Sequence, residues 1–135
     1  MKEKLIAALE KSRLYTLQVV AAMPEARFSF KPAEYIWSFG ELSHHMAYCM
    51  NWMDENYLQK NETAWSPTPV PAKKNAIIAY LEEAYLRVKT TLEHSKLNEE
   101  SVANFFSILE HTAHHRGQAT TYLRCVDITP PEYPF

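Results

Sequence analysis

The sequence predicts an all-α protein, a four-helix bundle in which a long crossover joins the second and third helices. Three observations predict this class. The eight prolines gather at positions 24–32, 67–71 and 130–134 and leave long proline-free blocks between them. Those blocks carry apolar residues at helical spacing, and no stretch alternates convincingly as a strand would. Residues 1–135 suit a single domain, because two domains of this total length would each bury too small a core.

The first two helices are predicted at residues 2–23 and 38–60. The second opens at Ser38, and Glu41 follows three residues later, which is the pattern of a capping box. The first presents one apolar face, formed by Leu5, Leu9, Thr16, Leu17 and Val20.

The third and fourth helices are predicted at residues 72–93 and 99–126, with a polar break between them at 94–98. The linker at 61–71 is rich in proline and can reach about 35 Å at about 3.1 Å per residue. A helix of ~22 residues is about 33 Å long. The linker can therefore run the length of the bundle and leave the second and third helices parallel. The apolar stripe of the third helix consists of Ile77, Leu81, Ala84, Tyr85, Val88 and Leu92.

Composition excludes several classes of function. The formal net charge is −2 and the basic residues are scattered, so nothing favours binding to nucleic acid or to an anionic membrane. No apolar run approaches the ~20 residues that span a bilayer, and MKEKLIAALEKS has the pattern of an amphipathic helix rather than of a signal peptide. The two cysteines are expected to be free thiols, which favours the cytoplasm.

Three of the six histidines lie within five positions of the fourth predicted helix, in EHTAHHRGQATTYLRC. At about 100° per residue, His115 lies about 40° from His111, and both border the apolar stripe that contains Ile108 and Ala119. His114 points away from that stripe. Residues four apart on one helix face are neighbours, and two imidazoles at this spacing can share one metal ion.

A second histidine pair lies in ELSHHMAYCMNWM, in the second predicted helix. His45 lies about 80° from the centre of the apolar stripe, whereas His44 lies nearly opposite and is predicted to face solvent. His45, His111 and His115 would supply three neutral nitrogen ligands and leave one coordination position open, as catalytic zinc sites do. Zinc and nickel are the leading metals, and manganese and iron also accept imidazole. Metal-free core histidines are the alternative interpretation.

Other residues near these histidines have two interpretations each. Gln118 and Tyr122 lie on the same helix edge as His111, where they would hold a metal-bound water or a substrate, or form a polar seam between helices. Cys49 follows His45 by one turn and is either a fourth ligand or a small buried thiol.

Two arginines and a glycine occupy unusual positions in the predicted helices. Arg116 lies on the far side of the stripe, where an ion pair or an interface contact is expected. Arg13 falls within the stripe of the first helix and either meets an anionic substrate or extends its charged end to solvent. Gly117 lies in the middle of a predicted helix, which suggests close packing of another segment against it.

The segments FKPAEYIWSFGELSHHMAY, HTAHHRGQ, YLR and PPEY resemble the DinB-like (DinB/YfiT-type) bundle proteins from about residue 30 to the end of the chain. The resemblance implies a four-helix bundle with a long crossover, and a divalent metal ion held by three histidines. Carried over by position, these are His45, His111 and His115, the set that the helical angles also select. The sequence departs from the family pattern in a shorter segment between the third and fourth helices. It also has Val126 and Asp127 where a glycine commonly follows the last helix.

Activities in this family are diverse and include thiol S-transferases that use bacillithiol, mycothiol or glutathione. The resemblance therefore implies a metal-dependent transferase that takes a low-molecular-weight thiol and a small electrophilic substrate. A metal-dependent hydrolase is one alternative, and a bundle that binds a metal or ligand without catalysis is another. No general base or other catalytic residue is identifiable from the sequence. The oligomeric state is open, with a homodimer as one option.

Overall fold

The computed structural model describes residues 1–134 and contains no strand in that range. The all-α class is therefore confirmed. The ends of the first, third and fourth predicted helices lie within two residues of the observed ones, whereas the α-helical part of the second ends seven residues before its predicted end, at Met53. No helix in the described range is long and apolar enough to cross a membrane. The four long helices are α1 (Lys2–Ala22), α2 (Phe39–Met53), α3 (Lys74–His94) and α4 (Glu99–Cys125).

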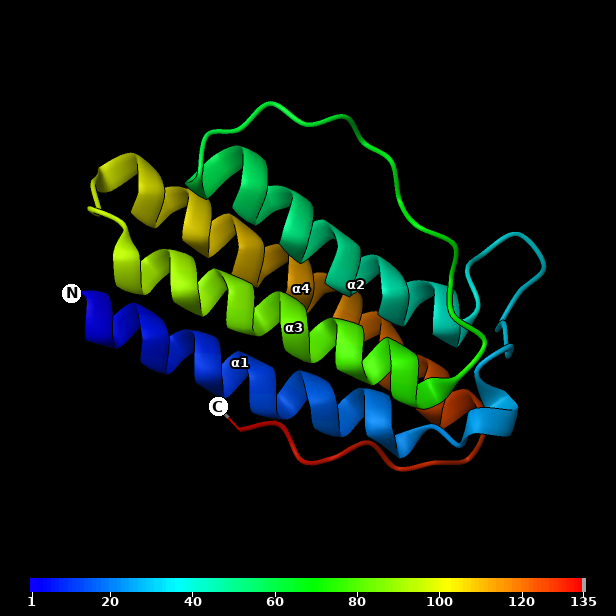
Figure 1. The fold of residues 1–135 in the computed structure, drawn as a ribbon. Helices are drawn as coiled ribbons and strands as arrows, with labels where there is room; N and C mark the ends of the chain where they lie inside the picture. The colour runs from blue at the N-terminus through cyan, green and yellow to red at the C-terminus, as the bar shows by residue number, and fades with distance from the viewer. Residues whose placement is uncertain (135) are drawn as a thin grey trace.

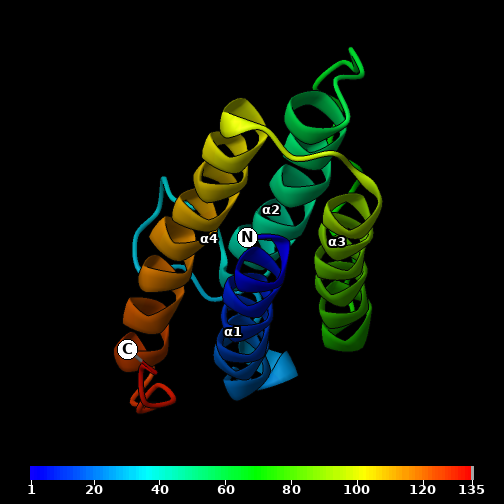
Figure 2. The ribbon, with the colours of Figure 1, turned by 90° about the vertical axis from the view of Figure 1, so that its left-hand side faces the viewer.

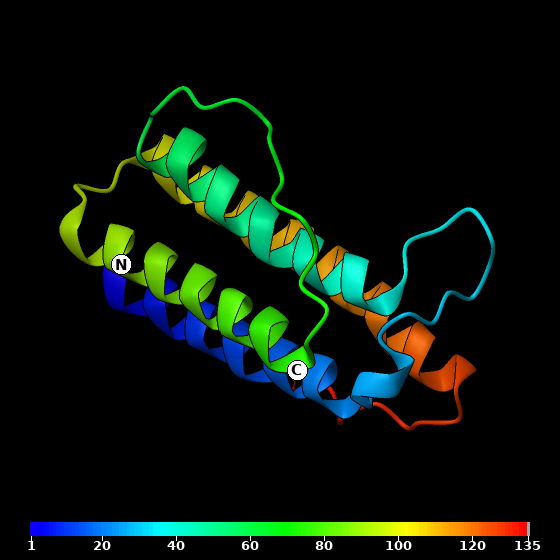
Figure 3. The ribbon, with the colours of Figure 1, turned by 45° about the vertical axis from the view of Figure 1, so that its right-hand side comes forward.

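The helices form a bundle in which α1 and α4 run in one direction and α2 and α3 in the other (Figure 1). Each of α1 and α2 packs against both α3 and α4, so that α1 and α2 lie diagonally opposite one another (Figure 2). Because α2 and α3 are parallel, the chain must run from the end of one to the opposite end of the bundle before the other begins. Residues 59–73 form this connection along the outside of the bundle (Figure 3). The predicted crossover is thus confirmed.

The crossover is attached to the outer surface of α2. The backbone N–H of Ser66 donates to the Tyr48 hydroxyl at 2.6 Å, and the Trp65 ring packs edge-on against Tyr48 with centroids 4.8 Å apart. Trp52 donates its indole N–H to the carbonyl of Thr63 at 3.3 Å. A face of α2 that points away from the bundle core is consequently covered by the chain itself.

Local signals explain where α2 begins and how it ends. The backbone N–H of Ser38 donates to the Glu41 carboxylate at 2.6 Å and that of Glu41 donates to the Ser38 hydroxyl at 3.1 Å, so the predicted capping box is present. At its other end α2 widens into a π-helical turn, η2 (Asp54–Leu58). The fully buried Asp54 carboxylate accepts hydrogen bonds there from Gln59 at 2.6 Å and Arg87 at 3.2 Å.

The core follows the predicted faces closely. All six predicted stripe residues of α3 are buried, whereas Leu17 of α1 is only partly buried and Val19 takes its place in the core. Arg13 pairs with Glu10 at 2.6 Å and with Glu82 of α3 at 2.8 Å, so its guanidinium serves as a link between α1 and α3.

The two glycines lie in opposite surroundings. A Cβ atom on Gly117 would have no neighbour within 4 Å among residues 1–134, so the close approach expected there is wrong. The close approach occurs at Gly40 instead, where a Cβ atom would lie 3.2 Å from the Phe28 carbonyl oxygen. The backbone N–H of Gly40 donates to that same oxygen at 2.8 Å. Gly40 thus lets the segment after α1 lie directly on the first turn of α2.

Candidate metal centre

Three imidazoles converge where α2 packs against α4. Their ring centroids are 5.3 Å apart for His45 and His111, 4.6 Å for His45 and His115, and 4.5 Å for His111 and His115. The Nε2 atoms of His111 and His115 are 3.1 Å apart. Both helix-four histidines face the histidine of α2 because they are one turn apart on the edge that borders the core. The structure therefore brings together the three residues that the sequence singled out.

Cys49 joins this cluster from α2, one turn after His45. Its Sγ atom lies 3.3 Å from Nε2 of His45. Among the described residues, the compact group able to hold a metal ion consists of His45, Cys49 and His111, whose ligand atoms all lie within 4.8 Å of one another. His115 is not in that group and lies against His111. The predicted ligand set and this group thus share His45 and His111 and differ in the third member.

Burial keeps the cluster electrically neutral. It lowers the pKa of His45 to about 4, and repulsion from His115 and His111 contributes further. The pKa of His111 is also lowered to about 4, by burial and then by His115 and His114. Burial raises the pKa of the Cys49 thiol to about 12. Neutral imidazoles keep a lone pair available, which is the form in which histidine binds a metal.

Gln118 orients one of these rings. Its Oε1 atom accepts a hydrogen bond from Nδ1 of His115 at 2.8 Å, which leaves Nε2 of that ring as the free lone pair. Burial lowers the pKa of His115, and the bond to Gln118 opposes this shift. Tyr122 is turned elsewhere, because its hydroxyl donates to the backbone carbonyl of Trp37 at 2.8 Å. It therefore anchors the segment that precedes α2.

The remaining histidines in the two helices differ from one another. His114 is exposed, as predicted. His44 is only 3% exposed, so the prediction that it faces solvent is wrong. Its Nε2 atom lies 3.2 Å from the hydroxyl of Thr68, and its ring lies 5.3 Å from that of Tyr80. The physical reason is the crossover, which covers the face of α2 on which His44 lies.

Two tryptophans flank the cluster and were not recognised from the sequence. The Trp37 ring lies 4.3 Å from that of His45 and 5.9 Å from that of His115. The Trp65 ring, on the crossover, lies 6.2 Å from His45. Trp37 immediately precedes the capping residue Ser38, and this adjacency to the start of the histidine-bearing helix is the signal that could have identified it.

A cavity of about 530 Å³ opens beside His115. A small organic molecule bound there would lie against apolar and aromatic surface at one end of the histidine cluster. The residues that line it are Pro32, Tyr35, Ile36, Trp37, His115, Gln118, Thr121 and Tyr122.

Comparison with solved structures agrees with this architecture. A crystal structure of a DinB-like protein from Bacillus cereus ATCC 10987 is similar over 96% of this chain and 95% of its own length, with a TM-score of 0.82 and 17% sequence identity. A DinB-like protein from Bacillus subtilis is similar over 98% of this chain and 96% of its own, with a TM-score of 0.72 and 21% identity. No protein-family model and no curated protein sequence matches the chain. The chain therefore has the fold of the DinB-like four-helix bundles.

Proposed function

We propose that the protein binds one divalent metal ion through His45, His111 and His115 and uses it in catalysis. The observation that carries this proposal is the convergence of three half-buried imidazoles from two helices, with depressed pKa values and the Nε2 atoms of His111 and His115 only 3.1 Å apart. Burying several imidazoles side by side is unfavourable unless something binds their lone pairs. A donor set of three neutral nitrogens suits zinc or nickel, and manganese and iron also accept it.

The reaction that we propose is transfer of a low-molecular-weight thiol to a small electrophile. A bound divalent cation would lower the pKa of a thiol or water that occupies its open position. In the transfer, the sulfur forms a bond to an electrophilic carbon, the leaving group departs with the bonding electrons, and the thiol proton goes to solvent. The choice rests on the resemblance of FKPAEYIWSFGELSHHMAY and HTAHHRGQ to the DinB-like proteins, whose activities include thiol S-transferases.

The chain's own residues have definite roles in this proposal. Gln118 holds the tautomer of His115 and thereby directs Nε2 towards the cluster. Trp37 and the apolar wall beside it would bind the organic part of the electrophile and exclude water from one side. Tyr122 keeps that wall in place through its bond to the Trp37 carbonyl.

The test begins with the metal content of protein purified without an affinity tag, which should be about one divalent ion per chain. The loaded protein is then assayed with bacillithiol, mycothiol, glutathione and coenzyme A against a chlorobimane, from which chloride leaves. The rate should require the metal and be lost in His115→Ala, while His114→Ala should keep it. A metal-dependent rate of ester hydrolysis with no thiol transfer would assign a hydrolase, and bound metal without either rate would assign a binding protein.

A further inference from the structure

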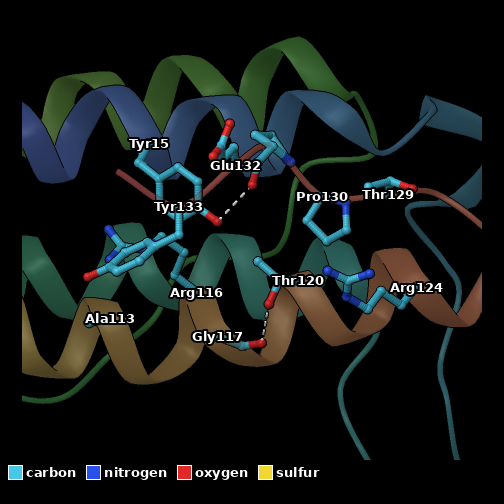
Figure 4. Close-up of a pocket in the computed structure, with 11 residues that line it drawn as sticks. Tyr15, Ala113, Arg116, Gly117, Thr120, Arg124, Thr129, Pro130, Glu132 and Tyr133 are labelled. Atoms are coloured by element: carbon cyan, nitrogen blue, oxygen red, sulfur yellow. Dashed lines mark hydrogen bonds between the residues drawn. The ribbon is translucent and has the colours of Figure 1, made fainter. Parts of the chain in front are cut away.

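A second cavity, of about 620 Å³, lies on another face of α4 (Figure 4). It is an open pocket lined by residues of α1, of α4 and of the C-terminal segment 129–133, which runs back along the bundle (Figure 1). Tyr15 of α1 holds this segment, because its hydroxyl donates to the carbonyl of Pro131 at 3.1 Å and its ring packs edge-on against that of Tyr133 at 5.3 Å. No residue of the metal centre lines this cavity.

The wall of this cavity contains a buried arginine that has no carboxylate partner among residues 1–134. Arg116 is 8% exposed, and its guanidinium lies 4.9 Å from the centre of the Tyr15 ring and 5.9 Å from that of Tyr133. Its Nη1 atom donates to the hydroxyls of Thr16 at 3.2 Å and Ser12 at 3.4 Å. Of the two alternatives expected from the sequence, the ion pair does not occur within residues 1–134, and Arg116 contacts α1 instead. A buried guanidinium normally has an anion beside it, because an unpaired buried charge is strongly unfavourable.

The two ends of the cavity differ in chemistry. Arg116 lies beside the two tyrosine rings, and Arg124, two turns further along α4, lines the cavity with Thr129 and Pro130 (Figure 4). Glu132 also lines it, and its carboxylate disfavours a ligand with two or three negative charges. Aromatic rings and proline form much of the remaining wall. This combination matches a monoanion with a flat apolar body.

We propose that this cavity binds a small aromatic monocarboxylate, whose carboxylate accepts hydrogen bonds from Arg116 and whose ring packs against Tyr15 and Tyr133. A guanidinium presents its donors in a planar fork that fits a carboxylate. The two tyrosine rings, which contact one another and both lie near that guanidinium, offer the apolar surface for the body of the ligand. The site is independent of the metal centre and of the reaction proposed there.

Phenylacetate is a suitable probe, and its binding is measured by titration of backbone amide NMR signals. We expect saturable shifts around Thr120, Arg116 and Tyr133, with a dissociation constant on the order of 1 mM for a ligand of this size. Phenylacetamide, which lacks the charge, and acetate, which lacks the ring, should bind at least about tenfold more weakly. Inorganic phosphate should not compete.

Single substitutions test whether phenylacetate binds in this cavity. Arg116→Gln should weaken it about tenfold or more, and Tyr133→Ala, on the C-terminal segment, should weaken it as well. Arg116→Lys keeps the charge without the planar fork and should also bind worse, which keeps the test decisive if the glutamine variant fails to fold. Arg27→Gln, at the exposed turn η1 (Glu25–Arg27), is the matched control and should bind normally.

Carboxylates also bind metal ions, so His45→Ala is titrated in parallel and should bind phenylacetate as the parent chain does. The proposal is overturned if no saturable shifts appear, or if phenylacetamide binds as well as phenylacetate. It is equally overturned if Arg116→Lys and Tyr133→Ala both bind with unchanged affinity, or if His45→Ala abolishes binding.

Discussion

The histidine cluster depends on imidazoles that stay neutral inside the protein. His45 and His111 have their pKa lowered to about 4 by burial first and by neighbouring imidazoles second. In the folded metal-free chain these imidazoles are therefore harder to protonate than in the unfolded chain. Acid consequently favours the unfolded chain and lowers the free energy of unfolding. The same property makes them ready ligands at neutral pH.

The stability of the metal-free protein should fall as the pH is lowered from 6.5 to 4. The unfolded chain protonates His45 and His111 near pH 6.5, whereas the folded chain keeps them neutral down to about pH 4. Protons therefore bind preferentially to the unfolded chain in this window, and stability present above pH 6.5 is lost progressively. Urea midpoints measured in EDTA at several pH values test this, and the double variant His45→Asn, His111→Asn should show a shallower slope. Equal slopes would contradict it.

Two single substitutions distinguish His115 from Cys49 as the third metal ligand. If His115 is the ligand, His115→Ala should weaken zinc binding about 100-fold or more, and Cys49→Ala should change it little. His45→Ala and His111→Ala should be as damaging as His115→Ala, and exposed His114→Ala is the control. Gln118→Ala should cost about tenfold, because it only orients His115. Competition with a zinc-sensitive dye measures these affinities. Loss in Cys49→Ala with none in His115→Ala would assign the cysteine instead.

At the scale of elements, α4 presents different chemistry on different faces. His111 and His115 face α2, while Arg116, next in sequence to a metal-centre residue, lies against Tyr15 of α1. Consecutive residues on a helix point about 100° apart, so one helix can serve two neighbours. The helix continues through Gly117, and no other segment in residues 1–134 comes within 4 Å of the position that a Cβ atom would take there.

Gly117→Ala should stabilise the protein by about 0.5–1 kcal/mol, because alanine loses less backbone entropy in a helix and its Cβ has open space. Gly40→Ala should have the opposite sign. Its Cβ would lie 3.2 Å from the carbonyl oxygen of Phe28, and that oxygen already accepts the backbone N–H of Gly40. Thermal unfolding of the two variants beside the parent chain measures both effects. Equal effects of the two substitutions would show that helix propensity alone decides them.

At the scale of the whole molecule, the crossover determines both the topology and the surroundings of the site. Residues 59–73 return along the bundle and allow α2 and α3 to run in parallel. On the way, Trp65 packs near His45, and Thr68 meets His44. A single irregular segment thereby connects the fold to the environment of the histidines.

Deletion of residues 61–68 should abolish the native arrangement. The part of the crossover that remains could extend over at most about 25 Å, whereas α3 is about 31 Å long. A glycine–serine segment of the original length should keep the fold and lose the contacts of Trp65 and Thr68. Amide NMR spectra and urea unfolding of the two variants distinguish these results. A native spectrum after the deletion would contradict the need for a full-length return.

Much of the architecture could be predicted because it depends on short-range rules. Proline placement delimited the helices, the spacing in α3 identified six buried residues, and Ser38 with Glu41 marked the start of α2. Helical angles likewise selected His45, His111 and His115, whose rings do converge. Each of these inferences uses only the geometry of one helix.

The sequence by itself thus determined the all-α class, the helix ends other than the end of α2, most of the apolar faces and the three histidines that meet. Only the tertiary structure decided that His44 is buried, that Cys49 joins the cluster and that Trp37 flanks it. It also decided that Arg116 is buried against α1 with no ion pair to a carboxylate of residues 1–134. Periodicity along a helix assigns one face to the core and treats the other as solvent-exposed. The crossover and the C-terminal segment cover parts of those other faces through contacts between residues far apart in the chain, and no local pattern encodes where such segments lie.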